Sequence, residues 1–278
     1  MNYFKIDMKR LVTSKKLIVV IILLFAISII DPITVFIQFS NYVGSAERIG
    51  QNPFQFWMLM NSVSWGNNLY NYMFWIFAVL LTGLIYFEDK NTSFYMYQIT
   101  RKSRNQYLTS KLTSTWLFSF ILMLLVLEVN LIVTYTLFPD TAAKTEYFYR
   151  LVPSEGSFAY ESFSAHPIYM AQIYTFLNAL AMSIFVLFSL CLHMLFKFTN
   201  RYVALLIPVI ILYGISFIFD SFPGLFSYNI RMILQPRATS ALSTIITWEN
   251  VYVVIGGWVL VNCLLISIIF LKSRDCYE

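Results

Sequence analysis

Apolar residues in this sequence gather in long blocks separated by shorter polar stretches. A helix must keep about 20 mostly apolar residues together to cross a membrane, because the hydrocarbon core is about 30 Å thick and a helix rises about 1.5 Å per residue. Six blocks meet this requirement, at residues 17–39, 69–87, 114–138, 170–196, 203–219 and 251–271. We therefore predict an all-α integral membrane protein with six transmembrane helices, forming a single transmembrane domain over residues 1–278.

The composition agrees with this pattern. Apolar residues make up 59% of the chain and charged residues 12%, against about 25% charged residues in an ordinary globular domain. So few charges could not cover the surface of a soluble protein. The basic residues flank the apolar blocks and form no stripe, so we expect no nucleic-acid partner.

The distribution of lysine and arginine predicts the orientation. Fourteen of the 19 basic residues lie in the segment 1–16, in the loop 88–113, between the fourth and fifth blocks, and after the sixth. Loops rich in Lys and Arg stay on the cytoplasmic side of a membrane. We expect a multi-pass protein of the plasma membrane, with both termini in the cytoplasm.

Residues 1–16 have the pattern of an amphipathic helix. One helical face collects the apolar residues Phe4, Met8, Leu11 and Val12, and the lysines lie mainly off that face. Such a helix suits the inner membrane interface. It is interpreted either as a collar around the bundle or as a basic anchor that only sets the topology.

The loop 88–113 is the one substantial cytoplasmic loop. It opens with the acids Glu88 and Asp89, continues with a helix-start signal at Asn91 and Thr92, and then has aromatic residues that include Tyr95. A basic cluster with Arg101 and Arg104 follows. Exposed aromatic residues with a charged rim are typical of a protein-docking surface. Aromatic residues that simply lie on the membrane interface would explain the pattern equally well.

The loop also resembles a known family. The residues Glu88-Asp89, Asn91-Thr92, Arg101-x-Ser-Arg104 and Tyr107-Leu-x-Ser-Lys111-Leu are similar to the corresponding loop in permease subunits of type-2 ABC exporters. In many such permeases a Gly-Thr pair stands where this chain has Asn91-Thr92. Those permeases also have a turn that contains proline at the place where this chain has residues 100–104.

This resemblance implies a function and its partners. The loop would contain a coupling helix that sits in a groove of a separate ABC ATPase subunit, and residues 1–16 would be the elbow helix. The residues expected to contact the ATPase are Glu88, Asp89, Thr92, Tyr95, Arg101 and Arg104. The other partner would be a second copy of this chain or a related permease.

The chain carries no motif for binding ATP or a metal. No G-x-x-x-x-G-K-[ST] sequence occurs, and this is the motif that cradles phosphates in P-loop ATPases. We expect no cofactor on this chain, with ATP and Mg²⁺ held by the partner ATPase, and no enzymatic activity of its own. Its two histidines and three cysteines have no metal-site spacing. His193 is interpreted as a packing residue or as part of a proton relay.

Two acids, Asp31 and Glu128, lie within the predicted spans, and Asn130 adds polarity near Glu128. A charge at mid-membrane costs roughly 2.5–3.5 kcal/mol on insertion scales, so such residues usually have a purpose. They either tie helices together or form the acidic lining of a translocation path. Pro32 and Pro208 are expected to kink or open their helices. The outer loop 220–250, broken by Pro223-Gly224 and Pro236, suits re-entrant half-helices.

These observations favour an ATP-driven exporter that moves hydrophobic or amphipathic cargo, such as a peptide, toxin, antibiotic or lipid, out of the cell. Two alternatives stay open. The chain could be a stand-alone immunity protein that sequesters a toxin in the membrane without transport. It could also be an intramembrane enzyme that acts on lipid or peptide.

Overall fold

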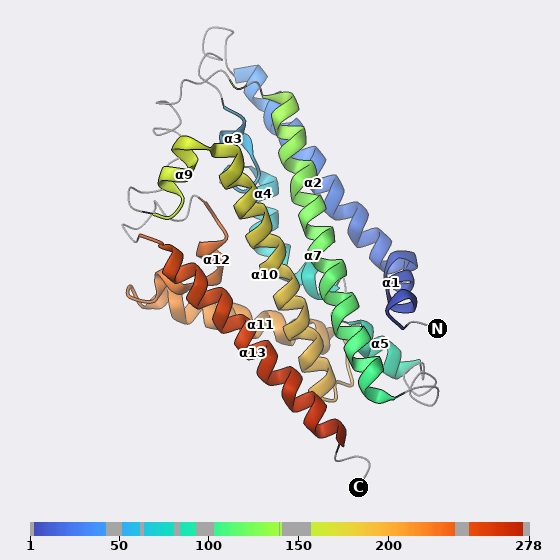
Figure 1. The fold of residues 1–278 in the computed structure, drawn as a ribbon. Coiled ribbons are helices and arrows are strands. Elements are labelled where there is room, and N and C mark those ends of the chain that lie inside the picture. The colour runs from blue at the N-terminus through green and yellow to red at the C-terminus, as the bar shows by residue number, and fades with distance from the viewer. Residues whose placement is uncertain are drawn as a thin grey trace.

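The computed structural model describes residues 3–42, 52–61, 64–80, 84–92, 103–138, 140, 157–236 and 245–274. Within these ranges the chain is helical and contains no strand. The helices form an elongated bundle, in which the first helix, α1 (Tyr3–Thr13), and the last part of α13 (Trp248–Arg274) lie toward the same end (Figure 1). The prediction of an all-α protein is therefore confirmed for the described part.

Five helices are long and apolar enough to cross a membrane. They are α2 (Lys15–Tyr42), α7 (Arg104–Leu137), α10 (Pro167–Leu195), α11 (Arg201–Ser221) and α13 (Trp248–Arg274). Each contains one of the predicted spans 17–39, 114–138, 170–196, 203–219 and 251–271, or nearly all of it. The chain is thus a multi-pass membrane protein, with five of the six predicted spans found as long helices.

The predicted span at residues 69–87 differs from the other five. Its first part is α4 (Trp65–Ala78), with 14 residues, and its last part lies in α5 (Ile85–Asn91). Between them, residues 79–80 have the wider hydrogen-bonding pattern of a π-helix, and residues 81–83 lie outside the described ranges. At about 1.5 Å per residue, α4 alone is about 21 Å long, which is shorter than the hydrocarbon core.

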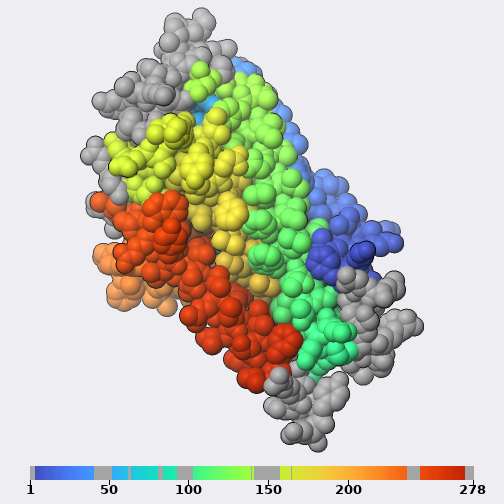
Figure 2. All heavy atoms as spheres, viewed as in Figure 1, coloured from blue at the N-terminus to red at the C-terminus, as the bar shows by residue number. Residues whose placement is uncertain are grey.

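The helix α10 is the centre of the bundle. It packs mainly against α7 and α13 and also contacts α4, α5 and α11. Small side chains at Ala171, Ala179 and Ala181 are fully buried and let neighbouring helices approach closely. In the space-filling view α10 is seen only as a strip between α7 and α13 (Figure 2).

The outer helices expose apolar surfaces instead. On α2 the exposed residues include Ile22 and Ile37, on α11 Ile210, and on α13 Leu260 and Leu264, each at least half exposed. Soluble monomeric proteins rarely expose so much apolar surface to water. Lipid is the natural solvent for these faces, in agreement with the membrane location.

The N-terminal segment forms its own helix, α1 (Tyr3–Thr13), which packs on the start of α7. The buried face differs from the predicted one. Leu11 is fully buried, but Val12 is 56% exposed, and the fully buried residue one turn before Leu11 is Asp7. The face is set by a polar contact of Asp7, described below, which the apolar pattern did not include.

The described part of the segment 220–250 folds as short helical pieces after the end of α11 (Arg201–Ser221). They are η3 (Phe226–Tyr228) and α12 (Ile230–Ile233), and residues 237–244 lie outside the described ranges. Asn178 donates a hydrogen bond to the carbonyl of Leu234 at the end of α12 (3.0 Å). This hydrogen bond joins α10 to the end of α12. Two further short helices, α3 (Pro53–Phe56) and α9 (Tyr160–Ala165), lie at the far end of the bundle from α1 (Figure 1).

Candidate coupling site

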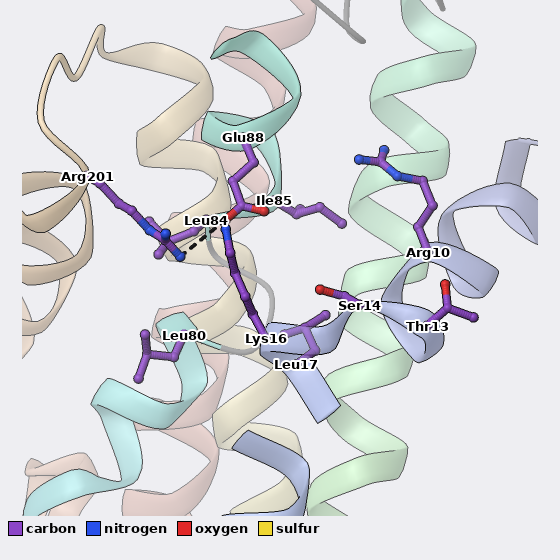
Figure 3. A pocket seen from close by; sticks show the side chains of 10 residues that line it. All are labelled: Arg10, Thr13, Ser14, Lys16, Leu17, Leu80, Leu84, Ile85, Glu88 and Arg201. Carbon is purple, nitrogen blue, oxygen red and sulfur yellow. Dashed lines mark hydrogen bonds and ion pairs between the residues drawn. The ribbon is translucent and has the colours of Figure 1, made fainter. Parts of the chain in front are cut away.

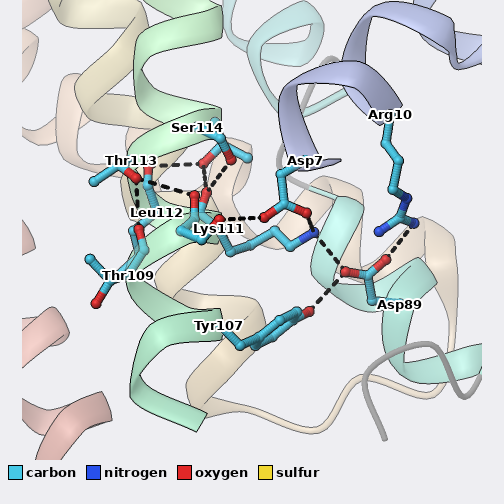
Figure 4. A network of polar contacts seen from close by, with 11 residues as sticks. Asp7, Arg10, Asp89, Tyr107, Thr109, Lys111, Leu112, Thr113 and Ser114 are labelled. Atoms are coloured by element: carbon cyan, nitrogen blue, oxygen red, sulfur yellow. Dashed lines mark hydrogen bonds and ion pairs between the residues drawn. The ribbon is translucent and has the colours of Figure 1, made fainter. Parts of the chain in front are cut away.

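A cluster of buried charges joins three helices at the end of the bundle that holds α1. Lys111 of α7 is fully buried, and its Nζ lies 2.7 Å from Oδ1 of Asp7 and 2.8 Å from Oδ2 of Asp89. Asp7 comes from α1 and Asp89 from α5, and both carboxylates are also fully buried. One lysine therefore ties α1, α5 and α7 together (Figure 4).

The remaining carboxylate oxygens of the cluster are also occupied. Arg10 donates to Oδ1 of Asp89 (2.7 Å), Tyr107 donates to Oδ2 of Asp89 (2.8 Å), and Ser110 donates to Oδ2 of Asp7 (2.8 Å). Two acids face two bases, so the cluster is neutral as a whole. Buried ion pairs persist only when their remaining hydrogen-bond positions are filled in this way.

A second, more exposed group lies next to this cluster. Glu88 of α5 accepts from Nζ of Lys16 (2.8 Å), at the start of α2, and pairs with Arg201 (3.2 Å), the first residue of α11. Figure 3 shows the side chains of Lys16 and Arg201 converging on this carboxylate. Glu88, in the middle of α5, thereby joins the N-termini of two spanning helices.

The predicted ATPase-contact residues fall into three groups. Glu88, Thr92 and Arg104 lie at the accessible rim of the buried charge cluster. Thr92 ends α5, and its Oγ1 donates a hydrogen bond to the carbonyl of Glu88 (2.8 Å). Asp89 is fully buried, so its carboxylate is inaccessible to a partner protein. The carboxylate instead holds α5 in place. Tyr95 and Arg101 lie outside the described residues.

Sequence reasoning missed Asp7 and assigned Lys111 only to a motif. Asp7 is the single acid among residues 1–16, and it lies one turn before Leu11. One acid on the apolar side of a basic helix is a signal for a buried partner. Lys111 sits between the apolar residues Leu108 and Leu112 and one turn after Tyr107, which is a comparable signal.

Asn130, predicted for a translocation path, is buried and repairs the backbone of α2. Pro32 has no N–H, so the carbonyl of Ser28 four residues earlier loses its helical partner. Asn130 donates to that carbonyl (2.8 Å) and accepts from the amide of Met58 (3.2 Å). The helix consequently continues through Pro32.

The same arrangement recurs at the second proline. Pro208 leaves the carbonyl of Ala204 without its helical donor, and Nε2 of His193 lies 2.8 Å from that oxygen. His193 is almost fully buried between α10 and α11. Its position and contact account for it as a structural donor, and no proton relay is needed to explain it.

The two acids of the spans occupy different environments. Asp31 is fully buried and accepts a hydrogen bond from the backbone amide of Gly66 (2.8 Å), which joins α2 to α4. Glu128 on α7 is only partly buried, and it accepts from Nε2 of Gln172 on α10 (3.1 Å). Asp31 and Asn130 are thus buried within the bundle, and Glu128 is the one of these three residues that is partly exposed.

A large apolar cavity lies away from all of these charges. It has a volume of about 530 Å³ and opens between α11, α13 and η3, and Phe188 of α10 also lines it. Its walls include Ile211, Tyr228, Val254 and Trp258. The hydrophobic pattern of the sequence did not locate this cavity.

Within the described ranges, no group of three or more His, Cys, Asp or Glu residues is placed to hold a metal ion. Cys191 is buried and Cys263 exposed, and the structure records no disulfide for either. Comparisons of the whole chain with protein-family profiles, with curated proteins and with solved structures find no match.

Proposed function

We propose that this chain is the transmembrane permease subunit of an ATP-driven ABC exporter that moves hydrophobic or amphipathic cargo out of the cell. A separate ABC ATPase would bind its cytoplasmic loop. A second copy of the chain, or a related permease, would complete the transporter. The chain itself would bind no ATP.

One observation carries the proposal. Both flanks of the loop segment 93–102 are anchored in the buried charge cluster, through Asp89 before the segment and through Tyr107 and Lys111 after it. Separating a buried ion pair costs several kcal/mol, so α1, α5 and the start of α7 should move as one body. A partner that pushes on the loop would move the first turns of the spanning helices with it.

The rim residues suit contact with such a partner. Glu88, Thr92 and Arg104 lie beside the loop, and Arg101 belongs to the same basic cluster in the sequence. Charged rims of protein interfaces mainly set association rate and register. We therefore expect charge changes here to affect coupling more than folding.

The first test is a pull-down of the tagged full-length chain from its native host in mild detergent, with mass spectrometry of the bound proteins. A stoichiometric ATPase with a P-loop supports the proposal. If the chain is folded and monodisperse but no ATPase is bound, the exporter proposal fails.

The second test separates coupling from binding. The double reversal Arg101→Glu with Arg104→Glu should leave basal ATPase activity intact but lower transport per ATP. The double reversal Lys5→Glu with Lys9→Glu is the matched control, because Lys5 and Lys9 are exposed and lie on α1. Equal coupling in both variants would remove the loop from the mechanism.

The apolar cavity favours a second candidate function, which is sequestration without transport. A pocket of about 530 Å³ between α11 and α13 could hold an apolar segment of a toxin in the membrane. The two functions differ in their need for energy. Protection that persists in ATP-depleted cells would support sequestration over export.

A further inference from the structure

A second pocket, of about 280 Å³, lies between the α1–α2 junction, α5 and the start of α11. Its polar lining comes from Arg10, Thr13, Ser14, Lys16, Glu88 and Arg201, and its apolar floor from Leu17, Leu80, Leu84 and Ile85. Figure 3 shows these polar side chains surrounding the space from three directions. The pocket thus combines cationic walls with an apolar base where two spanning helices begin.

The charges around the pocket do not cancel. Arg10 is balanced within the neutral cluster of Asp7, Asp89 and Lys111. Glu88, by contrast, faces both Lys16 and Arg201, which leaves one positive charge in excess. These three side chains are accessible, with exposures of 35% for Glu88, 63% for Lys16 and 44% for Arg201.

The backbone adds to this positive potential. Lys16 is the second residue of α2 and Arg201 the first residue of α11, and these helices have 28 and 21 residues. Each helix directs the positive end of its dipole toward its first turn. Anions bind readily where such an N-terminus and basic side chains coincide.

We propose that this pocket binds the phosphate of an anionic phospholipid from the cytoplasmic leaflet. A phosphodiester headgroup with one negative charge matches the single excess positive charge. The apolar floor and the lipid-facing surface of α2 would receive the start of its acyl chains. A zwitterionic lipid carries the same phosphate together with a cation, and the pocket disfavours that second charge.

The test titrates the purified full-length chain in neutral detergent with phosphatidylglycerol or phosphatidylcholine and counts bound lipid by native mass spectrometry. Phosphatidylglycerol should bind at least tenfold more tightly. The variant Lys16→Gln with Arg201→Gln should weaken its binding about thirty-fold, from the usual effect of two basic residues at an anionic surface. Glu88→Gln should strengthen it several-fold, because the competing carboxylate is neutralised.

A matched control keeps the result specific. Lys9→Gln with Lys15→Gln removes the same charge from exposed positions on α1 and α2 that do not line the pocket. This control should change the affinity less than threefold. An equal loss in both double variants would show general surface attraction and overturn the proposal.

Two further outcomes would also overturn it. Equal binding of phosphatidylglycerol and phosphatidylcholine would exclude a charge-selective headgroup site. Displacement of the lipid by equimolar glycerol phosphate would assign the pocket to a soluble phosphate compound instead. If the double variant does not fold, the opposite sign predicted for Glu88→Gln decides the question, since unchanged or weaker binding in that variant refutes the site.

Discussion

Replacement of Lys111 by methionine should be among the most destabilising single changes in this protein. Methionine keeps much of the length of the side chain but removes the ammonium group that lies 2.7 Å from Asp7 and 2.8 Å from Asp89. The buried cluster then carries a net charge of one negative unit, with two carboxylates and only Arg10 to balance them. Removal of one partner from a buried pair costs about 3–5 kcal/mol.

A double-mutant cycle tests the cause of this loss. Asp7→Asn alone leaves the cluster positive, whereas Asp7→Asn with Lys111→Met leaves it neutral, with Asp89 still paired to Arg10. The double variant should therefore lose less stability than the sum of the single variants. For residues in one ionic network we expect a coupling of about 1–3 kcal/mol.

The assay is reversible unfolding of the full-length chain in mixed micelles with increasing denaturing detergent, followed by tryptophan fluorescence. Lys9→Met is the control, because Lys9 lies on α1 with its side chain exposed, and its stability should stay close to that of the wild type. Strictly additive losses would refute the argument from charge balance. A loss for Lys111→Met no larger than that for Lys9→Met would refute the buried cluster itself.

Three further predictions follow from single contacts. His193→Leu should lower the free energy of unfolding by about 1–3 kcal/mol, because it leaves a buried carbonyl unpaired. Adding Pro208→Ala should recover much of this stability by restoring the helical N–H. An unchanged loss of stability in the double variant would contradict this explanation. Gly66→Ala should lower the melting temperature, because a Cβ would overlap the buried Asp31 carboxyl, whereas Gly214→Ala has open space and should not; equal shifts contradict it. If the proposed export function holds, Glu128→Gln should slow ATP-driven uptake of a fluorescent amphipathic cation into inside-out vesicles that contain this chain, at unchanged protein level. Unchanged uptake would remove Glu128 from the proposed path.

The spans were predictable because their signal is local. A run of about 20 apolar residues identifies a spanning helix without knowledge of its neighbours, and five such helices agree with the structure. The second predicted span is described only as two pieces, α4 and α5, with residues 81–83 outside the described ranges, so it is not confirmed as a continuous helix. The α4 helix packs against α10 and α11, and hydropathy does not report such contacts.

The candidate site was predictable only in part. The loop motif predicted that both Glu88 and Asp89 belong to the site. In the structure Glu88 lies at the rim of the buried charge cluster, and Asp89 is fully buried. The partners that separate them lie far away in the sequence, since Arg10 is 79 positions from Asp89. Pairings over such distances depend on how helices pack, so they require the structure.

Polar residues within the spans show the same division between what is local and what is not. A proline in the sequence indicates that one backbone carbonyl lacks its helical N–H donor. It does not indicate which group takes the place of that donor. The structure supplies Asn130 from 102 positions away for one carbonyl and His193 for the other. Since these residues satisfy backbone and Asp31 secures α4, their polarity is explained by folding. Glu128 satisfies no backbone group in its recorded contact and is partly exposed, so its polarity is the one that folding explains least.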